Sequence, residues 1–529
     1  MKKTVAIVVI SIILISTIIT INSTSSVYAQ TTVSLTIKPD GSITPSTDLI
    51  KNQANHYVLT DDIYGTLVIQ KDNIVLDGAG HKLDREGRGG FALSAGIRDH
   101  NQNPEFVGTN NVVIKNLEIV DYHYGIEVAG SNNQIIGVTL TGGNTHNGVA
   151  IWDSGSNTII NKCNIFNNEG IGIYSGNGVI ISDNYIVNNS HMGIQFRSAI
   201  GKLRNNLLFN NRLAFSFSTF PTSSDIIDVS NIIDGKPVYC WVNEHDRTLP
   251  SEAGYVALIN CNNITVQGLS VFASEEIKHN SNGINLYSTR DSTIKNNYLQ
   301  AGTGISMSGQ NNIISENYLG DGIKLSSASN ISVTKNNAKG ISLSSSSDCV
   351  VSENTLVGCS KALSLWASDQ NRFVQNNIED CSIGVSIFNS DRNVFSDNIF
   401  INNTHNVSET HYTDALRLGP YYESVGNIWD GNYWSTYTGT DSNKDDIGDI
   451  LFTVYEDKTD ESPLMIPFSV NDYTLDLQSI SPVPISIPTP FPTTNTDFPV
   501  IIIISIIAVL STIVILVYFN QSKRKKKID

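Results

Sequence analysis

The chain has 529 residues, of which 40% are hydrophobic and 16% are charged. A chain of this length and apolar content forms a large folded body, which excludes a mainly disordered protein. Acidic residues outnumber basic ones 50 to 34, which gives a net charge of −16, so nucleic acid and anionic surfaces are not expected partners.

The N-terminal segment, residues 1–29, has the pattern of a secretory signal peptide. Two lysines precede an apolar run from Thr4 to Ile21, and small residues lead up to Ala29. This pattern predicts export with cleavage after Ala29, and an uncleaved anchor is the alternative because the apolar run is long. Residues 30–72 are predicted to form an N-terminal cap, because the first turn of a repeat would otherwise expose unpaired strand edges.

Residues 73–411 contain a repeat in which a glycine or alanine is followed by alternating apolar residues, as in Gly170-Ile171-Gly172-Ile173. This alternation is the period of a strand and not of a helix. Short equivalent strands that stack about 4.8 Å apart bury a continuous core. The pattern therefore predicts an all-β parallel β-helix. The equivalent positions are Gly125, Gly148, Gly170, Gly193, Ala214, Gly283, Gly304, Gly322, Gly340, Ala362 and Gly384, which lie 18 to 23 residues apart except across one insertion at 219–281.

Asparagine recurs at a second position of the repeat, two residues before an inward apolar residue. Asparagine tolerates the backbone angles of tight turns, and its amide both donates and accepts hydrogen bonds. Stacked copies are therefore expected to bond to one another and to the turn backbone inside the coil, whereas solvated asparagine-rich loops would not explain the register. The set is Asn184, Asn206, Asn297, Asn317, Asn336, Asn354, Asn376 and Asn398.

The cysteines fit the same register. Cys359 and Cys381 both lie three residues before the equivalent position of adjacent turns, so their Cα atoms should stack near 5 Å and a disulfide is predicted there. Cys163 occupies an asparagine position and is predicted to be a buried small hydrophobic residue.

The insertion at 219–281 contains a cluster of aromatic and charged residues, from Trp241 and Glu244 to Arg247. Long insertions in solenoids often carry binding sites, and a structural flap over the edges of the coil is the alternative.

Residues 412–470 are predicted to form an aromatic C-terminal cap with an acidic loop. The loop places oxygen ligands at alternate positions, which suits a hard cation such as Ca²⁺, although it lacks the glycine and glutamate of an EF-hand. A solvated acidic turn is the alternative. The candidate Ca²⁺ ligands are Asp441, Asn443, Asp445 and Asp449.

The C-terminal end has the pattern of a single-pass membrane anchor. Residues 471–499 form a Pro/Ser/Thr-rich spacer, residues 500–519 are a predicted transmembrane helix, and 520–529 are a basic tail. The tail is expected in the cytoplasm and the body outside the cell. Outside the cell, sequons would be open to glycosylation at Asn188, Asn263, Asn330, Asn402 and Asn406.

Three short sequence motifs resemble those of one known family: Leu76-Asp77-Gly78-Ala79-Gly80-His81, Asp234-Gly235-Lys236-Pro237-Val238-Tyr239 and Asn432-Tyr433-Trp434-Ser435. With the repeat, they resemble the NosD-like β-helix proteins, whose repeats are also called carbohydrate-binding and sugar-hydrolase repeats. The resemblance covers roughly residues 36–470 and implies a right-handed parallel β-helix. For function it implies three alternatives: a surface binding protein, a polysaccharide lyase or glycoside hydrolase, and a copper-delivery factor.

The residues separate these alternatives in part. An enzyme of this kind needs converging carboxylates, and no pair occurs in the outward position two past the equivalent glycine. Copper delivery needs clustered imidazole or sulfur ligands. Three histidines share one position, namely His123, His146 and His191, with the first two expected to stack; exposed turn histidines are the alternative.

Aromatic side chains give the binding signal. An outward stripe four residues past the equivalent position is predicted to stack on the sugar rings of surface polysaccharide or other envelope components, and self-stacking that stiffens the coil is the alternative. The stripe comprises Trp152, Tyr174, Arg197, Tyr287, Trp366 and Phe388.

Overall fold

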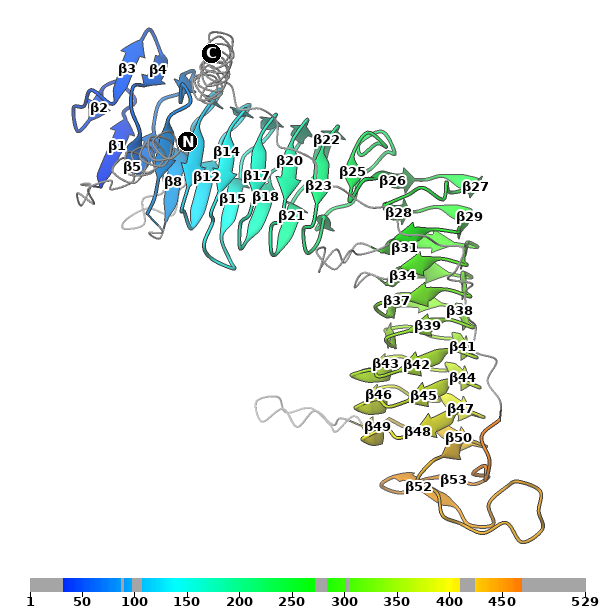
Figure 1. The fold of residues 1–529 in the computed structure, drawn as a ribbon. Helices are drawn as coiled ribbons and strands as arrows, with labels where there is room; N and C mark the ends of the chain where they lie inside the picture. Colours follow the sequence, from blue (N-terminus) through cyan, green and yellow to red (C-terminus); the bar gives the residue numbers. More distant parts are fainter. Residues whose placement is uncertain are drawn as a thin grey trace, which may run out of the picture.

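The computed structural model describes residues 32–86, 90–97, 107–271, 283–299, 304–409 and 424–468. Every regular element in these ranges is a β-strand, and the strands coil into a parallel β-solenoid (Figure 1). Within the same ranges, no helix has the length and apolar character needed to span a bilayer. The predicted signal peptide, spacer, transmembrane helix and basic tail lie outside the described residues.

Each turn of the coil contributes one short strand to each of three faces. The first face comprises β4 (His56–Leu59), β6 (Val75–Asp77), β10 (Val113–Lys115), β13 (Gln134–Ile136), β16 (Ile159–Asn161), β19 (Val179–Ser182) and β22 (Ile200–Arg204). It continues with β27 (His245–Thr248), β29 (Asn262–Gln267), β32 (Thr293–Lys295), β35 (Ile313–Ser315), β38 (Ser332–Thr334), β41 (Val350–Ser352), β44 (Arg372–Val374), β47 (Val394–Ser396) and β50 (Ile428–Asp430).

The second face follows the first after a tight corner. It comprises β7 (Lys82–Asp84), β11 (Glu118–Val120), β14 (Thr139–Thr141), β17 (Asn164–Phe166), β20 (Tyr185–Val187), β23 (Leu207–Phe209) and β25 (Ile232–Ile233). It continues with β30 (Ser270–Val271), β33 (Tyr298–Leu299), β36 (Tyr318–Leu319), β39 (Asn337–Ala338), β42 (Thr355–Val357), β45 (Asn377–Glu379), β48 (Ile399–Ile401) and β51 (Tyr433–Trp434).

The third face has the longest strands. It comprises β1 (Val33–Ile37), β5 (Ile63–Ile69), β8 (Phe91–Ile97), β12 (Tyr124–Val128), β15 (Val149–Asp153), β18 (Ile171–Ser175), β21 (Met192–Phe196) and β24 (Phe215–Phe217). It continues with β26 (Lys236–Val242), β28 (Tyr255–Ile259), β31 (Ile284–Arg290), β34 (Ile305–Gln310), β37 (Ile323–Ser329), β40 (Ile341–Ser344), β43 (Lys361–Trp366), β46 (Ile383–Phe388) and β49 (His405–Glu409).

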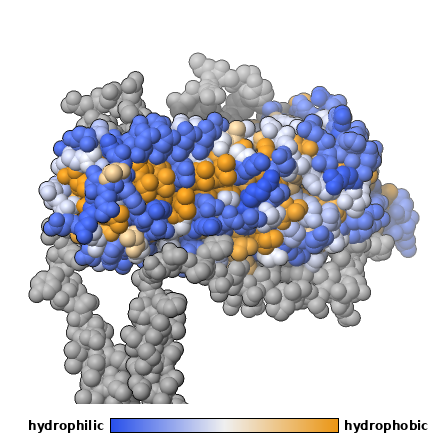
Figure 2. Space-filling model, turned by 90° about the horizontal axis from the view of Figure 1, so that it is seen from above, coloured by the Kyte–Doolittle hydropathy of each residue, from blue (hydrophilic) through white to orange (hydrophobic). Residues whose placement is uncertain are grey.

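Alternation of apolar residues fills the inside of the coil, as in β5, where Ile63, Leu67 and Ile69 are buried. The buried residues form two large clusters, one from Leu35 to Ile259 and the other from Trp241 to Trp434. Figure 2 views the N-terminal arm from above, where an apolar band runs between hydrophilic rims. The predicted parallel coil is thus confirmed, with its core inside two successive arms.

The two arms meet at a corner that gives the molecule the shape of an L (Figure 1). There β25 pairs in parallel with β23 and then turns back antiparallel to β26. Asp234 and Gly235 hold positive φ values of 47° and 80°, which a two-residue hairpin turn requires. Because β26 starts the third face of the second arm, this reversal restarts the coil in a new direction. The predicted insertion is therefore built into the solenoid as β25–β30, and the sequence does not place the corner.

The N-terminal cap is smaller than predicted, because the coil begins before residue 73. Strand β1 pairs antiparallel with β2 (Ile43–Thr44), and β3 (Ile50–Gln53) forms a hairpin with β4. However, β5 already pairs in parallel with β8 as part of the third face. A short strand, β9 (Val107–Gly108), pairs antiparallel with β8.

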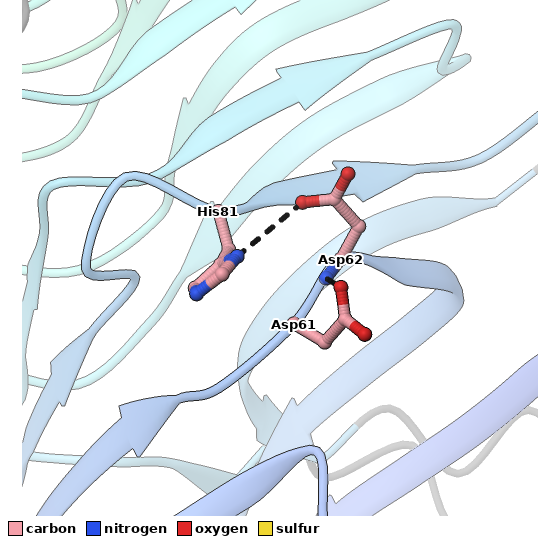
Figure 3. A group of neighbouring side chains, drawn as sticks. All are labelled: Asp61, Asp62 and His81. Carbon is pink, nitrogen blue, oxygen red and sulfur yellow. Dashed lines mark hydrogen bonds and ion pairs between the residues drawn. The ribbon is translucent and has the colours of Figure 1, made fainter. Parts of the chain in front are cut away.

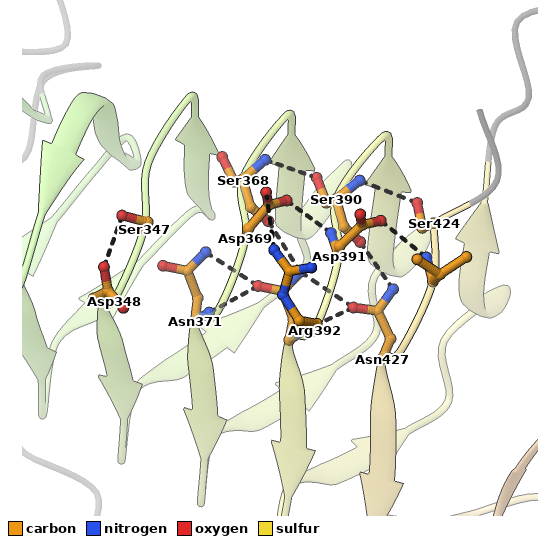
Figure 4. A network of polar contacts seen from close by, with 12 residues as sticks. Ser347, Asp348, Ser368, Asp369, Asn371, Ser390, Asp391, Arg392, Ser424 and Asn427 are labelled. Atoms are coloured by element: carbon orange, nitrogen blue, oxygen red, sulfur yellow. Dashed lines mark hydrogen bonds and ion pairs between the residues drawn. The ribbon is translucent and has the colours of Figure 1, made fainter.

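The predicted asparagine ladder is confirmed. The eight asparagines are buried, and in each arm Nδ2 of one residue donates to Oδ1 of the next copy at 2.8–3.0 Å. Each Nδ2 also donates to a backbone carbonyl, such as Asn354 to Val333 at 2.9 Å. A parallel ladder, which the sequence analysis did not predict, runs through Ser368, Ser390 and Ser424 (Figure 4).

The C-terminal end of the coil is closed by aromatic side chains, as predicted. Trp434 stacks on Phe400 with ring centroids 4.3 Å apart, and Trp429 stacks on Phe395 at 4.1 Å. The hairpin of β52 (Phe452–Tyr455) and β53 (Lys458–Asp460) lies beyond them, and Phe452 stacks on Trp434. Residues 412–423 of the predicted cap lie outside the described residues.

Candidate functional site

On the N-terminal arm, the predicted aromatic stripe is a packed cluster. Trp152 and Tyr174 are paired neighbours on β15 and β18, as predicted, and their ring centroids are 4.9 Å apart. Tyr124 packs edge-on against Trp152 at 5.6 Å and stacks with Phe91 at 4.8 Å. Because each ring covers its neighbour, Trp152 and Tyr174 are only half-exposed and offer little open aromatic face.

Arg197 does not belong to this stripe. The strand register pairs Tyr174 with Gln195, and Arg197 follows two residues later, past the end of β21. The register is set by the inward pair Ile173 and Ile194. Compared with the alignment by glycine, strand β21 is shifted by two residues, and such a shift leaves every side chain on the same face of the sheet. The spacing from the preceding glycine therefore misplaced Arg197.

Tyr287 also stands apart from the other stripe residues. Its ring lies against Phe220 with centroids 4.1 Å apart, and it packs on the core near the corner of the L. The continuous stripe predicted from the sequence is thus three separate aromatic clusters.

The C-terminal arm carries the open aromatic surface. Trp366 and Phe388 are paired neighbours on β43 and β46, and their rings stack at 4.1 Å with an interplanar angle of 19°. Trp366 is 54% exposed, whereas the other four tryptophans are half-buried or buried. This stacked pair, here called the aromatic platform, presents a flat apolar face to solvent.

A row of small polar side chains runs beside the platform along the third face. The strand register places one residue of each turn in it: Asn285, Ser306, Lys324, Ser342, Ser364, Ser386 and Ser408. Lys361 lies at the edge of the same face and donates from Nζ to Oγ of Ser386 at 3.2 Å. Hydroxyls, amides and ammonium groups beside a flat ring are the groups that sugars engage.

A polar groove interrupts the third face beside this row, where the strands β31, β34 and β37 end and the chain turns toward the first face. Strand β34 and its turn are one residue shorter than their neighbours, since Asn311 follows Ile305 by six positions whereas Asp291 follows Ile284 by seven. The pairing of β34 with β31 and β37 shifts at this point, so the surface is hollowed there. The groove is lined by Asn260, Ser288, Arg290, Ser308, Gln310 and Ser327, among others.

Carboxylates on the third face do not form a catalytic pair in the described residues. Glu127 is buried opposite Trp152 and accepts a hydrogen bond from Ser94 Oγ at 3.2 Å. The row through it continues as Tyr174 and Gln195. Asp153 points into the core, where burial raises the pKa of its carboxyl, and it accepts hydrogen bonds from Gly155, Thr158 and Gly176. Its role is structural.

The predicted histidine stack is wrong in its pairing. His146 lies beside His191, with ring centroids 5.1 Å apart, whereas His123 packs against Tyr124 at 4.3 Å. Burial, with the nearby charges of His146 and Arg212, lowers the pKa of His191. His146 sits in a long loop before β15, which carries it past the intervening turn.

The acidic loop between β51 and β52 uses its carboxylates to hold its own backbone. Asp441 Oδ1 accepts from the amides of Lys444 and Asp445, and Asn443 Nδ2 donates to Asp445 Oδ2 at 2.9 Å. Asp449 turns back to Ser442, with Oγ to Oδ2 at 2.7 Å. The predicted ligands are thus close in the chain, while Asp449 already has a local partner.

In the described ranges, the one group of three acidic, histidine or cysteine ligand atoms within 4.8 Å comprises Asp61, Asp62 and His81 (Figure 3). His81 Nδ1 lies 3.5 Å from Asp62 Oδ1, which also accepts the amide of Lys82 at 2.9 Å. Asp61 Oδ1 accepts the amide of Asp62 at 2.8 Å. These bonds explain the cluster without a metal.

All six cysteines are free and buried. Cys359 and Cys381 stack on adjacent turns as predicted, and the amide of Cys359 donates to Sγ of Cys381 at 3.3 Å. The predicted disulfide is not formed in this structure, although the stacking that it requires is present. Cys163 is fully buried in the core, as predicted, and its amide donates to Asn184.

Fold and surface together define a parallel β-solenoid with an exposed aromatic and hydroxyl-rich face. Two family models match the chain: "Periplasmic copper-binding protein (NosD)" over residues 259–439 and "Right handed beta helix region" over residues 97–248. The chain is therefore a NosD-like right-handed β-helix protein. No curated protein sequence matches it significantly.

Solved structures resemble it only distantly. The periplasmic alginate epimerase AlgG is 11% identical with a TM-score of 0.24, over 73% of this chain and 76% of that one. Tailspike protein 3 of bacteriophage CBA120 is 10% identical with a TM-score of 0.21, over 72% of this chain and 52% of that one. At these values the likeness carries no functional argument.

Proposed function

We propose that the chain is an exported, membrane-anchored surface protein that binds glycans of the cell envelope on the third face of its C-terminal arm. The observation that carries this proposal is the aromatic platform, in which Trp366 is 54% exposed and stacked on Phe388. An exposed indole in water has an unfavourable hydration that a sugar ring, stacked on it, relieves.

The neighbouring row supplies the polar half of such a site. Ser342 and Ser364 repeat at the strand spacing beside the platform, and both are partly exposed. Their hydroxyls both donate and accept hydrogen bonds, so they suit sugar hydroxyls in either orientation. Stacking on the platform would supply most of the binding affinity, and hydrogen bonds to the row would orient a glycan that runs along the arm.

Export and anchoring are supported by the signal-like residues 1–29 and the apolar run 500–519. The description of the matching NosD family model as periplasmic supports export as well. The spacer at 471–499 would hold the solenoid away from the membrane.

A glycan array probed with the full-length protein tests the binding role. Trp366→Ala should weaken binding to the retained glycan about tenfold, since stacking on an aromatic is worth about 1–3 kcal/mol. Its melting temperature should stay unchanged, because an outward side chain leaves no cavity in the core. Trp152→Ala is the matched control, and it should lower the melting temperature and leave glycan affinity intact. Equal affinity of Trp366→Ala and wild type would refute the platform as a glycan site.

Copper binding is the second candidate, favoured by the His146–His191 pair and by the description of the NosD model. Two imidazoles at this separation would supply part of a copper site. Titration of copper into wild type and His191→Ala, followed by d–d absorbance, tests it. Identical titrations would exclude the pair.

A further inference from the structure

We infer that the glycan bound by the C-terminal arm is acidic, and that its anionic group is held in the polar groove by Arg290. This inference rests on the proposed glycan-binding function and names the class of glycan. The observations that carry it are the shape of the groove, the charges around it and its alignment with the aromatic platform.

The groove has a definite structural origin. Because β34 is one residue shorter than β31 and β37, its turn recedes, and the flanking turns at Ser288 and Ser327 stand above it. Ser308 Oγ lies at the floor and accepts the amide of Ser288 at 3.0 Å. The hollow therefore lies where the missing residue of β34 shifts its pairing with both neighbouring strands.

The charge of the groove is opposite to that of the whole chain. Arg290 is exposed in its lining, and Lys324, which is exposed on β37 outside the lining, adds a second positive charge to the same face. Neither residue belongs to an ion pair of the described chain. Two cations without acidic partners, on a chain of net charge −16, favour an anionic ligand.

The lining chemistry suits a carboxylate or sulfate on a sugar. A guanidinium binds such groups through two parallel hydrogen bonds, and Gln310 and Ser327 provide further neutral donors. Asp291 is the nearest acid in the sequence, and its Oδ1 accepts Asn311 Nδ2 at 3.0 Å. No carboxylate lines the groove in the described residues.

The groove lines up with the platform along the axis of the arm. Ser308, on β34, is three turns from Trp366 on β43, with β37 and β40 between them. At about 4.8 Å per turn this is about 14 Å, a length that a short oligosaccharide spans. Arg290, on β31, is one turn further, about 19 Å from Trp366 along the axis. An oligosaccharide of that length would stack one sugar ring on Trp366 and place its acidic group at Arg290.

Acidic residues mark the other end of the arm and set the polarity of the site. Asp369 and Asp391 lie at the corner beyond Trp366, with Arg392 3.9 Å from Asp369 (Figure 4). Their Oδ1 atoms accept the amides of Asp391 and Val425. An anionic group is therefore expected at the groove and not at the platform.

Affinity electrophoresis of the full-length protein tests this inference, with dextran, dextran sulfate or polygalacturonate in the gel. The acidic polymers should retard the protein at least tenfold more strongly than dextran, and added salt should weaken the retardation. Retardation by polygalacturonate alone would identify a carboxylate, and retardation by dextran sulfate alone would identify a sulfate. Equal retardation by dextran would overturn the acidic class while leaving glycan binding intact, and retardation by none would refute both.

Charge-matched variants then locate the site. Arg290→Gln should weaken binding of the acidic polymer about tenfold, the usual value of a hydrogen bond to a charged group, and leave dextran binding unchanged. Lys335→Gln is the control, because Lys335 lies at the corner between the first and second faces, 3.7 Å from Glu353. Equal losses in the two variants would show a general charge effect and overturn the assignment to the groove. Both variants should have the same melting temperature as the wild type, since both side chains are exposed.

Discussion

Asn432 donates a hydrogen bond from Nδ2 to Oδ2 of Asp460, 3.0 Å away, and this contact ends the asparagine ladder of the C-terminal arm on a buried carboxylate. The same carboxylate accepts the amides of Gly431, Asn432 and Ser462 and the indole Nε1 of Trp434. A carboxylate only accepts hydrogen bonds, so it suits a chain of amides that all donate toward it. Asp460 is thus the acceptor that completes the last turn.

Replacement of Asp460 by alanine should destabilise the C-terminal arm by about 3 kcal/mol or more, because it leaves several buried donors without an acceptor. Chemical unfolding followed by tryptophan fluorescence checks this, since Trp429 and Trp434 lie at this end. Asp457→Ala, at an exposed turn in the same hairpin, is the control and should have little effect. Equal unfolding midpoints for the two variants would contradict the role of Asp460.

The corner of the L should depend on pH through Asp234. Burial raises the pKa of its carboxyl to about 6 from 3.8. Because the pKa of Asp234 is higher in the folded than in the unfolded chain, its neutral form stabilises the folded state fully below the unfolded pKa. That stabilisation is lost as the pH rises through the folded pKa. Wild type should therefore lose about 2 kcal/mol between pH 4 and pH 8 through this group.

Asp234→Asn should remove that loss, because asparagine accepts the amide of Asn210 and adopts a φ of 47°. Urea unfolding at pH 4 and pH 8 measures the difference. Asp291→Asn, at an exposed turn with a φ of 52°, is the control. A variant that is less stable than wild type at pH 8 would show that the ionised carboxylate stabilises the corner.

Calcium should stabilise the acidic loop if Asp441, Asn443, Asp445 and Asp449 bind it. Binding to the folded state raises the melting temperature, so chelation should lower it. Asp445→Ala should abolish this sensitivity, whereas Asp457→Ala should retain it. Melting curves of wild type that coincide with and without calcium would leave the loop as a solvated turn, held by bonds such as Ser442 to Asp449.

The membrane topology predicts the result of protease treatment of intact cells. Residues 32–468 should be released, while an epitope added after residue 529 should stay membrane-bound and protected. Permeabilised cells, in which the epitope is also digested, are the control. Full-length protein in the soluble cytosolic fraction would contradict export and anchoring.

The sequence predicted the repeated parts of this structure well, because they depend on local chemistry. Asn317 and Asn354 could be placed in a buried ladder from the register of the repeat, and the structure confirms the bonds. The same reasoning placed Trp152 beside Tyr174. It failed at Arg197, because counting from the preceding glycine ignores the inward pair of Ile173 and Ile194 that sets the strand register.

The candidate site could be predicted only in part. Trp366 and Phe388 share a position of the repeat, so their stacking followed from the sequence, but the greater exposure of Trp366 over Trp152 did not. That difference arises because Tyr124 packs edge-on against Trp152 from the preceding turn, whereas the preceding turn pairs Trp366 with the small residue Ser344. The missing residue in β34 was visible in the sequence, and it becomes a groove only when the longer neighbouring turns flank it.

The amino-acid sequence by itself therefore determined the β-solenoid, its inward residues and its asparagine ladder, since a side chain that alternates or stacks on its own copy needs no information from elsewhere in the chain. Only the tertiary structure decided the corner at Asp234 and Gly235, the acceptor role of Asp460 and the groove that Arg290 lines. These features join residues from different turns, and their geometry depends on strand register and on the direction of the coil, which no local pattern encodes.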